Sequence, residues 1–384
     1  MQKKILFVSH YAGRSGAPSV LLQVQQWLKE HTDIAFETVV LAGGGLLDDF
    51  RSMGKTTLCV PDKLDRYMKR AFVLCGSRAD EFSSCYARFA RRMTGAGIGL
   101  VYANTITNGA MLAALSRLRC PVICHVHEPE SLIRSHGSHN MALIKRHTTQ
   151  YIAVSERTKK NLVENHGITP DKVEVVCPDI NIKFLTGFYE KAQLPPGIPQ
   201  GAFIVCGSGQ GPNWVKGKDL FIQLAYLIAR DYPDMPIHFI WIGGSNEGID
   251  DYLINHDIAG AGLSGRVHLV PDVSNPLAYF NTCDVFVMVS REESFGLASI
   301  EAAALGKPVV CFEGASAVPE FVEQDAGYIV PYLDLDAMAE NIIRLARQPE
   351  LKKRLGDRAA EKVRQRHDLS AAGPAILRVI KQFI

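Results

Sequence analysis

Short apolar runs alternate along the chain with segments whose hydrophobic residues recur at helical spacing. The apolar runs of the first half are KKILFVS, FETVVLAG, LVYANT, PVICHVH and QYIAVS; those of the second half are AFIVCGSG, IHFIWIGG, RVHLVPD, DVFVMVS, PVVCF and GYIVP. Runs without polar alternation indicate parallel strands buried on both faces, and the helical segments between them indicate crossover connections. The pattern therefore predicts two α/β domains, each built on a doubly wound parallel sheet.

A segment without clear periodicity separates the two series of strands. Residues 180–201 are rich in Pro and Gly, which is typical of a linker between domains. A chain of 384 residues also exceeds the length over which a single hydrophobic core keeps growing. We expect an N-terminal domain over residues 1–185, a C-terminal domain over residues 186–365 and a final amphipathic helix over residues 366–384.

The strongest chemical signal lies between Ser290 and Cys311, which read SREESFGLASIEAAALGKPVVC. A buried strand ends there, a glycine-bearing turn follows, and a helix is predicted from Ser299 to Leu305. In open α/β sheets, ligands bind beyond the carboxyl ends of the strands, where the free N–H groups of a helix start attract a phosphate. We expect such a phosphate near Ser294 to Gly296.

Two glutamates flank this turn, Glu293 before it and Glu301 on the helix. If the whole interval were helical, the path between them would be about 12 Å, so the two carboxylates cannot share one metal ion or proton. A carboxylate accepts two hydrogen bonds at once and suits vicinal hydroxyls, which favours a sugar at Glu293 and a ribose at Glu301. The alternative is that both are unrelated surface residues beside a helix.

The Glu293-x7-Glu301 spacing, in its strand–turn–helix–strand context, resembles the E-x7-E signature of retaining glycosyltransferase family 4. The resemblance implies the GT-B fold, in which two Rossmann-like domains face each other across a cleft and the C-terminal helix crosses back to the first domain. It implies an acceptor side in the first domain and a nucleotide-sugar donor in the second. Glu293 would contact the donor sugar and Glu301 the ribose, while Phe295 and Gly296 would lie against the diphosphate.

A second glycine-rich loop, GSGQGPNWVKGKDLF, contains Lys216 and Gly217 ahead of a helix. A lysine there can neutralise a departing diphosphate. The family resembled has an arginine in this loop and a lysine before the glycine. Lys216 matches the lysine, but the loop has no arginine: Ser208 or Val215 stands in its place, and Lys218 would be a partial substitute. The plainer interpretation makes Lys216 a solvated lysine at a helix start.

Two features of the first half also match this family. In the loop HYAGRSGAPSVLL, small residues let the backbone approach a ligand, and the resemblance places a donor phosphate near Gly16. The strand PVICHVHEPE ends in His125 and His127, and the resemblance places His127 near the primary hydroxyl of the donor sugar. Alternation puts both imidazoles on one side, but no third metal ligand follows at convincing spacing. We expect no metal; the alternative role for His127 is a core or rim histidine.

A D-x-D triplet, Asp334-Leu335-Asp336, matches the metal-binding hallmark of the other large glycosyltransferase fold. It follows a late strand and stands just ahead of the helical segment AMAENIIRLA. We therefore interpret Asp336 as the N-cap of that helix.

Composition and charge narrow the partners. Lys+Arg total 42 and Asp+Glu 40, and a net charge of +2 gives no basic excess for a nucleic acid. The nine cysteines are scattered without a C-x2-C pair, which is typical of reduced thiols in a cytoplasmic protein. The apolar stretch in MQKKILFVSH is shorter than the h-region of a signal peptide, about 7 to 15 residues.

Residues 61–97 carry eight cations against four acids, interleaved with aromatic residues. Such basic helices can rest on an anionic bilayer, so we expect peripheral contact with the inner face of the membrane and a lipid-linked acceptor. An ordinary solvated helical face near the acceptor site accounts equally well for this composition.

These observations predict transfer of a hexose or related sugar from a nucleotide diphosphate sugar to the hydroxyl of a glycan or lipid-linked acceptor, with retention of configuration and without a cofactor. Bacterial polysaccharide or glycolipid synthesis is the expected setting, and His127 and Glu293 are the expected catalytic residues. Two alternatives stay open. One is a nucleotide-sugar epimerase or hydrolase; the other is a non-catalytic nucleotide-sugar-binding subunit, to which the missing loop arginine points.

Overall fold

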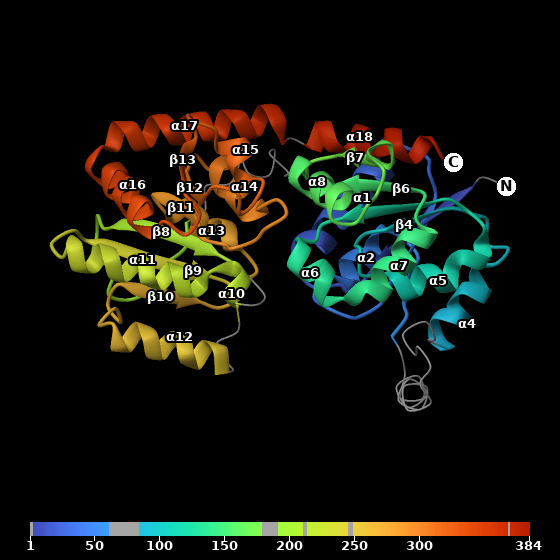
Figure 1. The fold of residues 1–384 in the computed structure, drawn as a ribbon, viewed down its shortest axis with the longest axis horizontal. Coiled ribbons are helices and arrows are strands. Elements are labelled where there is room, and N and C mark those ends of the chain that lie inside the picture. Colours follow the sequence, from blue (N-terminus) through green and yellow to red (C-terminus); the bar gives the residue numbers. More distant parts are fainter. Residues whose placement is uncertain (1–2, 61–83, 179–190, 210–212, 245–248, 368) are drawn as a thin grey trace. The chain divides into compact units, whose positions relative to one another are not determined.

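The computed structural model describes residues 3–60, 84–178, 191–209, 213–244, 249–367 and 369–384 (Figure 1). The chain forms two compact units: the first is Met1–Pro178 with Ser370–Ile384, and the second is Asp179–Leu369. The domain boundary expected at 185/186 lies outside the described residues. The expected boundary at 365/366 lies near the point where the chain returns to the first unit.

The first unit contains a seven-stranded parallel sheet with the order β3-β2-β1-β4-β5-β6-β7. Its strands are β1 (Lys4–Ser9), β2 (Phe36–Val40), β3 (Thr56–Leu58), β4 (Ile98–Ala103), β5 (Val122–Val126), β6 (Gln150–Ala153) and β7 (Val173–Val175). Its helices are α1 (Gly16–His31), α2 (Leu47–Met53), α4 (Ser84–Met93), α5 (Gly109–Leu115), α6 (Glu130–Ser135), α7 (Gly137–His147), α8 (Glu156–Glu164) and α18 (Leu369–Lys381), with short 3₁₀ turns at Ser116–Leu118 and Pro170–Lys172.

Helices cover both faces of this sheet because its strands are apolar on both sides. In β1, Ile5 and Phe7 pack in one cluster with α1, α2 and α18, and Leu6 and Val8 pack in another with α4, α5 and α7. Successive strand residues point to opposite faces, so one continuous apolar run supplies both clusters.

The C-terminal helix α18 completes the core of the first unit. Its Ile376, Val379 and Ile380 are buried in the same cluster as Ile5 and Phe7. Burying an aliphatic side chain of this size contributes about 1.5–3 kcal/mol, so the helix is an integral part of the unit. The predicted return of the C-terminal helix to the first domain is confirmed.

The second unit contains a six-stranded parallel sheet with the order β10-β9-β8-β11-β12-β13. Its strands are β8 (Phe203–Ser208), β9 (Ile237–Ile242), β10 (Val267–Val270), β11 (Val285–Met288), β12 (Val309–Phe312) and β13 (Gly327–Val330). Its helices are α10 (Asn213–Lys216), α11 (Lys218–Asp231), α12 (Ile249–Gly260), α13 (Pro276–Thr282), α14 (Leu297–Ala304), α15 (Val318–Val322), α16 (Leu335–Arg347) and α17 (Pro349–Arg366).

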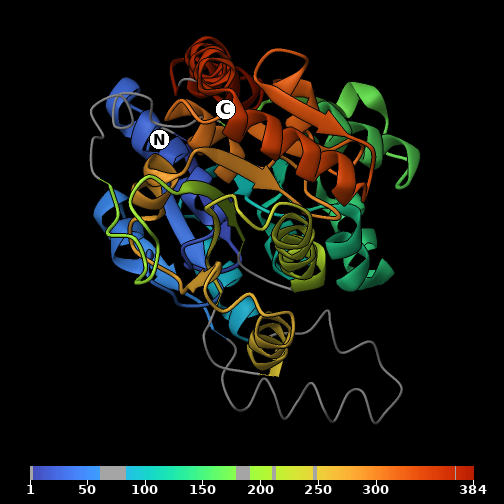
Figure 2. The same cartoon turned by 90° about the vertical axis from the view of Figure 1, so that its left-hand side faces the viewer.

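The core of the second unit lies between its sheet and α11, α12 and α16. Three aromatic rings form its centre: Phe221 packs edge-on against Phe239 at 5.5 Å and against Trp241 at 5.2 Å between ring centroids. Helices α11 and α12 lie side by side (Figure 2). This packing fixes the strand ends from which the candidate site is built.

Three helices of the second unit were not predicted: the four-residue α10, which lies in the expected glycine-rich loop, and the longer α12 and α17. In α12 the apolar residues are not confined to one stripe, and α17 reads PELKKRLGDRAAEKVRQR, which is mostly charged. The inner side of α17 combines small residues and two aliphatic side chains, Leu355 and Val363, with a fully buried lysine. The Nζ of this Lys362 binds the carbonyl oxygen of Phe321 and the carboxylate of Glu323. A buried cation of this kind is invisible to hydrophobic periodicity.

The helix after the D-x-D triplet, α16, has its N-cap two residues earlier than expected, and the predicted cap was wrong. Asp334, not Asp336, is the N-cap, and its Oδ1 accepts a 2.8 Å hydrogen bond from the N–H of Ala337. Asp336 lies in the first turn, where a carboxylate still interacts favourably with the helix dipole. A structural role for this triplet therefore holds.

Candidate functional site

The turn between β11 and α14 is shaped by a glycine that no other residue could replace without strain. Gly296 is the N-cap of α14 with φ of 96°, in the left-handed region. A Cβ atom there would lie 2.5 Å from Cγ2 of Val318 and 2.9 Å from Sδ of Met288. The backbone therefore packs directly against β11 and α15, and the first N–H groups of α14 follow immediately.

The side chains of this turn point mostly into the protein. Phe295 is 9% exposed and packs edge-on against His367, with ring centroids 5.5 Å apart, and Ser294 is 4% exposed. Ser299, in the first turn of α14, is 1% exposed, and its Oγ makes no hydrogen bond to any residue that the structure describes. Buried side chains leave the backbone as the part of residues 294–296 suited to contacting a phosphate.

Lys216 and Glu293 meet in the second unit. The Nζ of Lys216 donates a hydrogen bond to Oε2 of Glu293, and the two side chains are 25% and 20% exposed. Gly217, with φ of 72°, follows at once, and a Cβ atom there would lie 2.0 Å from the carbonyl oxygen of Val289. The sequence analysis placed Lys216 and Glu293 in one site, and the structure brings their side chains together.

Arg291 fastens the two loops to each other. Its backbone N–H binds the carbonyl oxygen of Val215 at 2.9 Å, and its Nη1 binds that of Trp214 at 2.7 Å. Its guanidinium also forms a bidentate pair with Asp219, at 2.8 and 2.7 Å, and these hydrogen bonds raise the pKa of Arg291. Sequence reasoning missed this arginine, because nothing in one sequence pairs a residue of one loop with a carboxylate 72 positions away.

The loop arginine expected by resemblance has no clear replacement. Arg291 is committed to Asp219, and Lys218 is 2% exposed, with its Nζ 2.9 Å from the position that a Cβ of Gly244 would occupy. Lys216 is therefore the cation that this loop presents beside Glu293 among the residues that the structure describes.

The carboxylate of Glu301, on α14, has no hydrogen bond or ion pair within the described part of the chain. Its side chain is half-buried, and burial raises its pKa to about 7. A carboxylate held near protein without a partner gains most from a ligand that donates hydrogen bonds, such as a vicinal diol.

In the first unit, His127 stands directly after β5 and contacts Asn104, which stands directly after β4. His127 Nε2 lies 3.1 Å from Oδ1 of Asn104, and Nδ2 of Asn104 donates a 2.7 Å hydrogen bond to the carbonyl oxygen of Ala17, at the start of α1. Asn104 therefore links His127 to the helix that begins at Gly16. Of the two predicted site residues of the first unit, His127 belongs to this network, and Gly16 directly precedes its member Ala17.

Other histidines crowd His127. His125 is 1% exposed, its Nδ1 lies 2.8 Å from the hydroxyl of Tyr102, and its ring centroid lies 4.1 Å from that of His127. Burial, followed by repulsion from His125 and His10, holds the pKa of His127 well below its usual value. Burial likewise lowers the pKa of His125 to about 3 and that of His10 to about 4. These imidazoles are neutral near pH 7.

Gly16 differs from Gly217 and Gly296, the two glycines of the second-unit site. It is exposed, and a Cβ atom added to it would meet nothing within 4 Å. The fold itself therefore does not require glycine at this position. The prediction that a ligand approaches its backbone stays a prediction.

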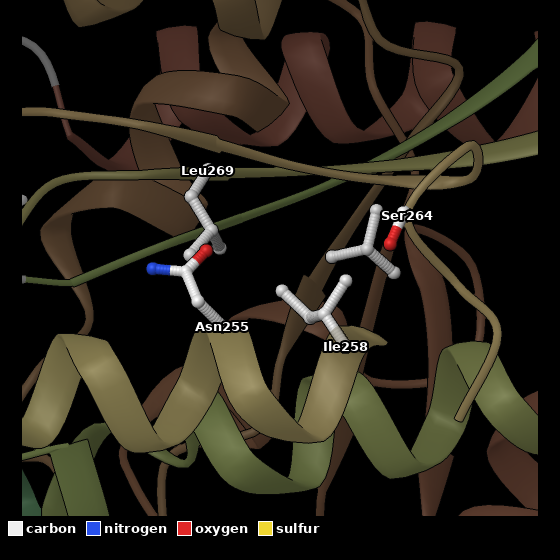
Figure 3. A pocket seen from close by; sticks show the side chains of 5 residues that line it. Asn255, Ile258, Ser264 and Leu269 are labelled. Atoms are coloured by element: carbon white, nitrogen blue, oxygen red, sulfur yellow. The ribbon is translucent and has the colours of Figure 1, made fainter. Parts of the chain in front are cut away.

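A cavity of about 400 Å³ lies elsewhere in the second unit, between α12 and the edge strand β10 (Figure 3). It contains no predicted site residue and no charged side chain; its lining residues are Asn255, Ile258, Ser264, Val267 and Leu269. It is unsuited to a diphosphate.

Across the described ranges, no group of three or more His, Cys, Asp or Glu side chains is arranged to hold a metal ion. Within the same ranges, no helix is both long and apolar enough to cross a membrane. Most of the basic segment 61–97 lies outside the described residues, and only its last part forms α4. The expectations of metal independence and membrane contact therefore stay predictions.

Two parts of the chain match known protein families. Residues 202–348 match the model "Glycosyl transferases group 1", and residues 61–184 match the model "Glycosyltransferase Family 4". A D-inositol 3-phosphate glycosyltransferase of Paenarthrobacter aurescens is 35% identical over 152 residues, which are 39% of this chain and 37% of that protein. The capsular polysaccharide biosynthesis glycosyltransferase CapM of Staphylococcus aureus is 35% identical over 98 residues, or 26% of each chain. The first two matches to inositol-phosphate enzymes span less than half of those relatives' length.

Solved structures resemble the whole chain. HepE of Anabaena, crystallised with UDP and glucose, has a TM-score of 0.81 at 20% identity over 99% of both chains. The sucrose-phosphate synthase of Thermosynechococcus elongatus has a TM-score of 0.75 at 17% identity, over 99% of this chain and 98% of the other. With two Rossmann-like units and this likeness, the chain has the GT-B fold, and the predicted fold class is confirmed.

Proposed function

We propose that this GT-B protein is a retaining glycosyltransferase that moves a sugar from a nucleotide diphosphate sugar to the hydroxyl of a glycan or lipid-linked acceptor. Matches of two segments to glycosyltransferase families support the class of activity. The likeness to HepE, whose crystal contains UDP and glucose, supports a nucleotide-sugar donor. The single observation that carries the proposal is the contact between Lys216 and Glu293 beside the glycine turn of α14.

This contact joins the two kinds of group that a nucleotide sugar requires. The ammonium of Lys216 suits a phosphate oxygen, and the carboxylate of Glu293 suits sugar hydroxyls. Without ligand the ammonium of Lys216 and the carboxylate of Glu293 bind each other, which holds both side chains in place. With donor bound, we propose that Lys216 turns to the diphosphate and Glu293 to the sugar.

The start of α14 supplies the second anion contact. Positive charge builds on the anomeric carbon as the diphosphate leaves, and negative charge builds on the phosphate oxygens. Backbone N–H groups at a helix start, following Gly296, stabilise that negative charge without any reorganisation. Glu301, half-buried and without a partner in the described chain, would then accept the ribose hydroxyls.

The first unit would supply neutral polar contacts. His127 has a lowered pKa and so offers a neutral imidazole to a sugar hydroxyl, while the backbone near Gly16 would approach the phosphate. We propose that the donor phosphate itself accepts the proton of the attacking hydroxyl, so that attack and departure occur on one face of the sugar and configuration is kept. No cofactor is required by this scheme.

Polysaccharide or glycolipid synthesis is the proposed setting. CapM is named as a glycosyltransferase of capsular polysaccharide biosynthesis, and other relatives are named as D-inositol 3-phosphate glycosyltransferases. A lipid-linked acceptor and contact with the inner membrane face fit the basic composition of residues 61–97.

The test begins with the donor. UDP-, GDP- and ADP-sugars are screened for a rise in melting temperature, and the best donor is incubated with candidate glycan acceptors. We expect a product whose new linkage has the anomeric configuration of the donor, read by NMR. Inversion would refute the retaining mechanism, and turnover of donor to an epimer or free sugar without acceptor would establish the alternative activity.

Glu293→Ala separates an enzyme from a binding subunit. We expect transfer to fall at least about 100-fold, because a charge-assisted contact to the reacting sugar is lost. The nearby Glu292→Ala is the matched control and is expected to retain transfer. Equal transfer by Glu293→Ala and the native protein, with both folded by circular dichroism, would refute the assignment of Glu293. Donor binding without turnover in the native protein would favour the subunit.

A further inference from the structure

Asn104 occupies a place that neither the motifs nor the comparisons assign. It follows β4 and is fully buried, and its backbone N–H binds the carbonyl oxygen of Val8 at 2.9 Å. Both polar atoms of its side chain are engaged: Nδ2 donates a hydrogen bond to the carbonyl oxygen of Ala17, and Oδ1 lies 3.1 Å from Nε2 of His127. A buried amide with both ends engaged has one orientation only.

That orientation determines which nitrogen of His127 carries a proton. A carbonyl oxygen can only accept, so the atom of Asn104 facing Ala17 must be the amide nitrogen. The atom facing His127 is then the oxygen, which also only accepts. Nε2 of His127 must therefore donate, and in a neutral imidazole the lone pair is left on Nδ1.

We propose that Asn104 is a positioning residue that fixes the Nε2–H tautomer of His127 and turns the Nδ1 lone pair toward a hydroxyl of the substrate. Within the described residues, Nδ1 of His127 has no hydrogen-bond partner, and the ring is partly exposed. A lone pair selects a donor such as a hydroxyl and disfavours a phosphate oxygen. The substrate contact rests on the proposed function, whereas the tautomer does not.

The tautomer is tested by NMR of protein labelled with ¹⁵N in its histidine rings, and His127→Asn identifies the signals of His127. We expect a protonated Nε2 and an unprotonated Nδ1 in the native protein. In Asn104→Ala the protection of the Nε2–H proton from exchange is expected to be lost, and transfer to fall about tenfold. A proton on Nδ1 in the native protein, or unchanged protection in Asn104→Ala, would overturn the proposal.

Asn108→Ala is the matched control. Asn108 is also buried, but its Nδ2 faces only the carbonyl oxygens of Val8 and Thr105, each at 3.4 Å. It is expected to lower stability and leave the ring signals of His127 in place. If Asn108→Ala changes those signals as much as Asn104→Ala does, general loosening of the fold explains them and the proposal fails.

Asn104→Asp provides a second variant of nearly the same shape. A carboxylate still accepts a hydrogen bond from Nε2–H, but its negative charge also raises the pKa of His127 by favouring the imidazolium. Glu128, whose carboxylate binds the backbone N–H of His127, would act in the same direction when ionised, whereas His10 and His125 lower that pKa. We expect the Nε2–H signal to persist and transfer to gain a pH dependence, falling where Nδ1 becomes protonated. Identical pH profiles for Asn104→Asp and the native protein would contradict the positioning role. If the native protein transfers no sugar, the proposed function fails while the NMR result still decides the tautomer.

A separate observation concerns Cys59, directly after β3, and Cys85, in the first turn of α4. Both are buried, at 6% and 8% exposure, and their Sγ atoms are 3.1 Å apart. A disulfide bond needs about 2.0 Å, so a small movement would join them. The sequence between these cysteines holds five of the eight cations of the basic segment.

We infer that Cys59 and Cys85 form a reversible disulfide in the presence of a disulfide oxidant such as oxidised glutathione. One thiolate attacks a glutathione sulfur and releases one glutathione; the second attacks the resulting mixed disulfide at the protein sulfur and releases the other. Two electrons pass from the two protein thiols to the oxidant, which leaves as two thiols. The bond would close the chain around residues 60–84 and restrict its freedom in the unfolded state.

The experiment treats the protein with oxidised glutathione, blocks remaining thiols and maps peptides without reduction. We expect a Cys59–Cys85 peptide pair, a higher melting temperature and reversal by dithiothreitol. Cys59→Ser and Cys85→Ser should each abolish the melting shift, whereas Cys124→Ser, which removes a buried thiol that faces the carbonyl oxygen of Thr105, should not. Both cysteines recovered as thiols, or Cys85 joined to a different cysteine, would overturn the inference.

Discussion

The two units bring different electrostatics to their candidate site residues. In the second unit the site is a set of charges: Lys216 against Glu293, Arg291 against Asp219, and Glu301 without a partner in the described chain. In the first unit His127 lies among imidazoles whose pKa values are lowered by burial.

This difference separates two tasks. Fixed charges suit a ligand that is itself charged, because ion pairs in a partly buried place are weakly screened. Neutral imidazoles and amides suit hydroxyl groups, whose direction they select without a net charge. Under the proposed function, the charged groups of the second unit would bind the diphosphate, and the neutral groups of the first unit would bind hydroxyls.

Removing the cation of the charged site is the strongest way to break this comparison. Lys216→Met is expected to lower the rate of transfer about 100-fold or more. The departing diphosphate would lose the positive charge that stabilises it, and the carboxylate of Glu293 would lose its hydrogen-bond partner. Initial rates at saturating donor measure the effect. The control Lys353→Met removes an exposed lysine of α17 and should retain the native rate of transfer. If it lowers the rate as much as Lys216→Met does, the loss reflects the net charge of the protein and not the position of Lys216.

The backbone of the charged site is the next target. Gly296→Ala is expected to lower the free energy of unfolding by about 2–3 kcal/mol, since a left-handed φ and a contact of 2.5 Å with Val318 both oppose a Cβ atom. Urea denaturation measures this, and donor affinity should fall with it. Gly16→Ala serves as the comparison: with open space around it, the same change should leave the stability of the first unit within about 0.5 kcal/mol.

The pH dependence of donor binding should distinguish the second unit from the first. Because burial raises the pKa of Glu301 to about 7, donor affinity should fall by up to about tenfold per pH unit below pH 7, as the carboxylate needed by the ribose becomes protonated. Glu301→Gln should flatten this dependence when donor binding is followed by calorimetry. A native affinity that is constant from pH 8 to pH 5 would contradict the role of Glu301.

The raised pKa of Glu301 has the opposite effect on stability: acidification should weaken donor binding but increase the free energy of unfolding. Its pKa is higher in the folded state than the ordinary 4.5, so the folded state binds more protons between pH 4.5 and about 7. Relative to Glu301→Gln, the native protein should lose stability as pH rises through this range and change no further above it.

His127 should show the smallest effect of pH. Its pKa lies well below the usual value, so the neutral ring persists throughout the physiological range and transfer should have no acid limb from His127 above pH 6. His127→Asn, which keeps a polar side chain of similar reach, should lower transfer about tenfold at all these pH values. A native acid limb that disappears in His127→Asn would show that the ring titrates after all.

The sequence predicted those parts of the molecule that depend on local pattern. The apolar runs located all six strands of the second sheet and five of the seven strands of the first; the three-residue edge strands β3 and β7 are too short to stand out as apolar runs. The turn around Gly296 with Glu293 could be recognised because strand, glycine and helix follow one another along the chain. The helix α17 escaped because its buried side relies on Lys362, whose charge is met by carbonyl oxygens and carboxylates of α15 and the residues after it.

Contacts between distant loops were out of reach. Lys216 and Glu293 were assigned to one site through a resemblance, but their direct contact could not be predicted. The same is true of the ion pair between Arg291 and Asp219 and of the contact between Asn104 and His127. Each of these contacts joins residues that follow different strands. Periodicity reports which face of an element is buried; it does not report which side chains meet once parallel strands are placed beside one another. Asp334, as the true cap, shows the same limit at the scale of one turn.

The return of α18 to the first unit has a consequence for synthesis on the ribosome. Residues 370–384 are translated only after the whole second unit, yet Ile376, Val379 and Ile380 cover apolar side chains of β1 and α1. The first unit is synthesised first, but part of its core stays exposed to solvent until residues 370–384 have been made. The second unit can complete its folding before that point. Nascent chains halted before residue 370 should be bound by chaperones through the first unit, and removing α18 from the finished protein should expose the same surface.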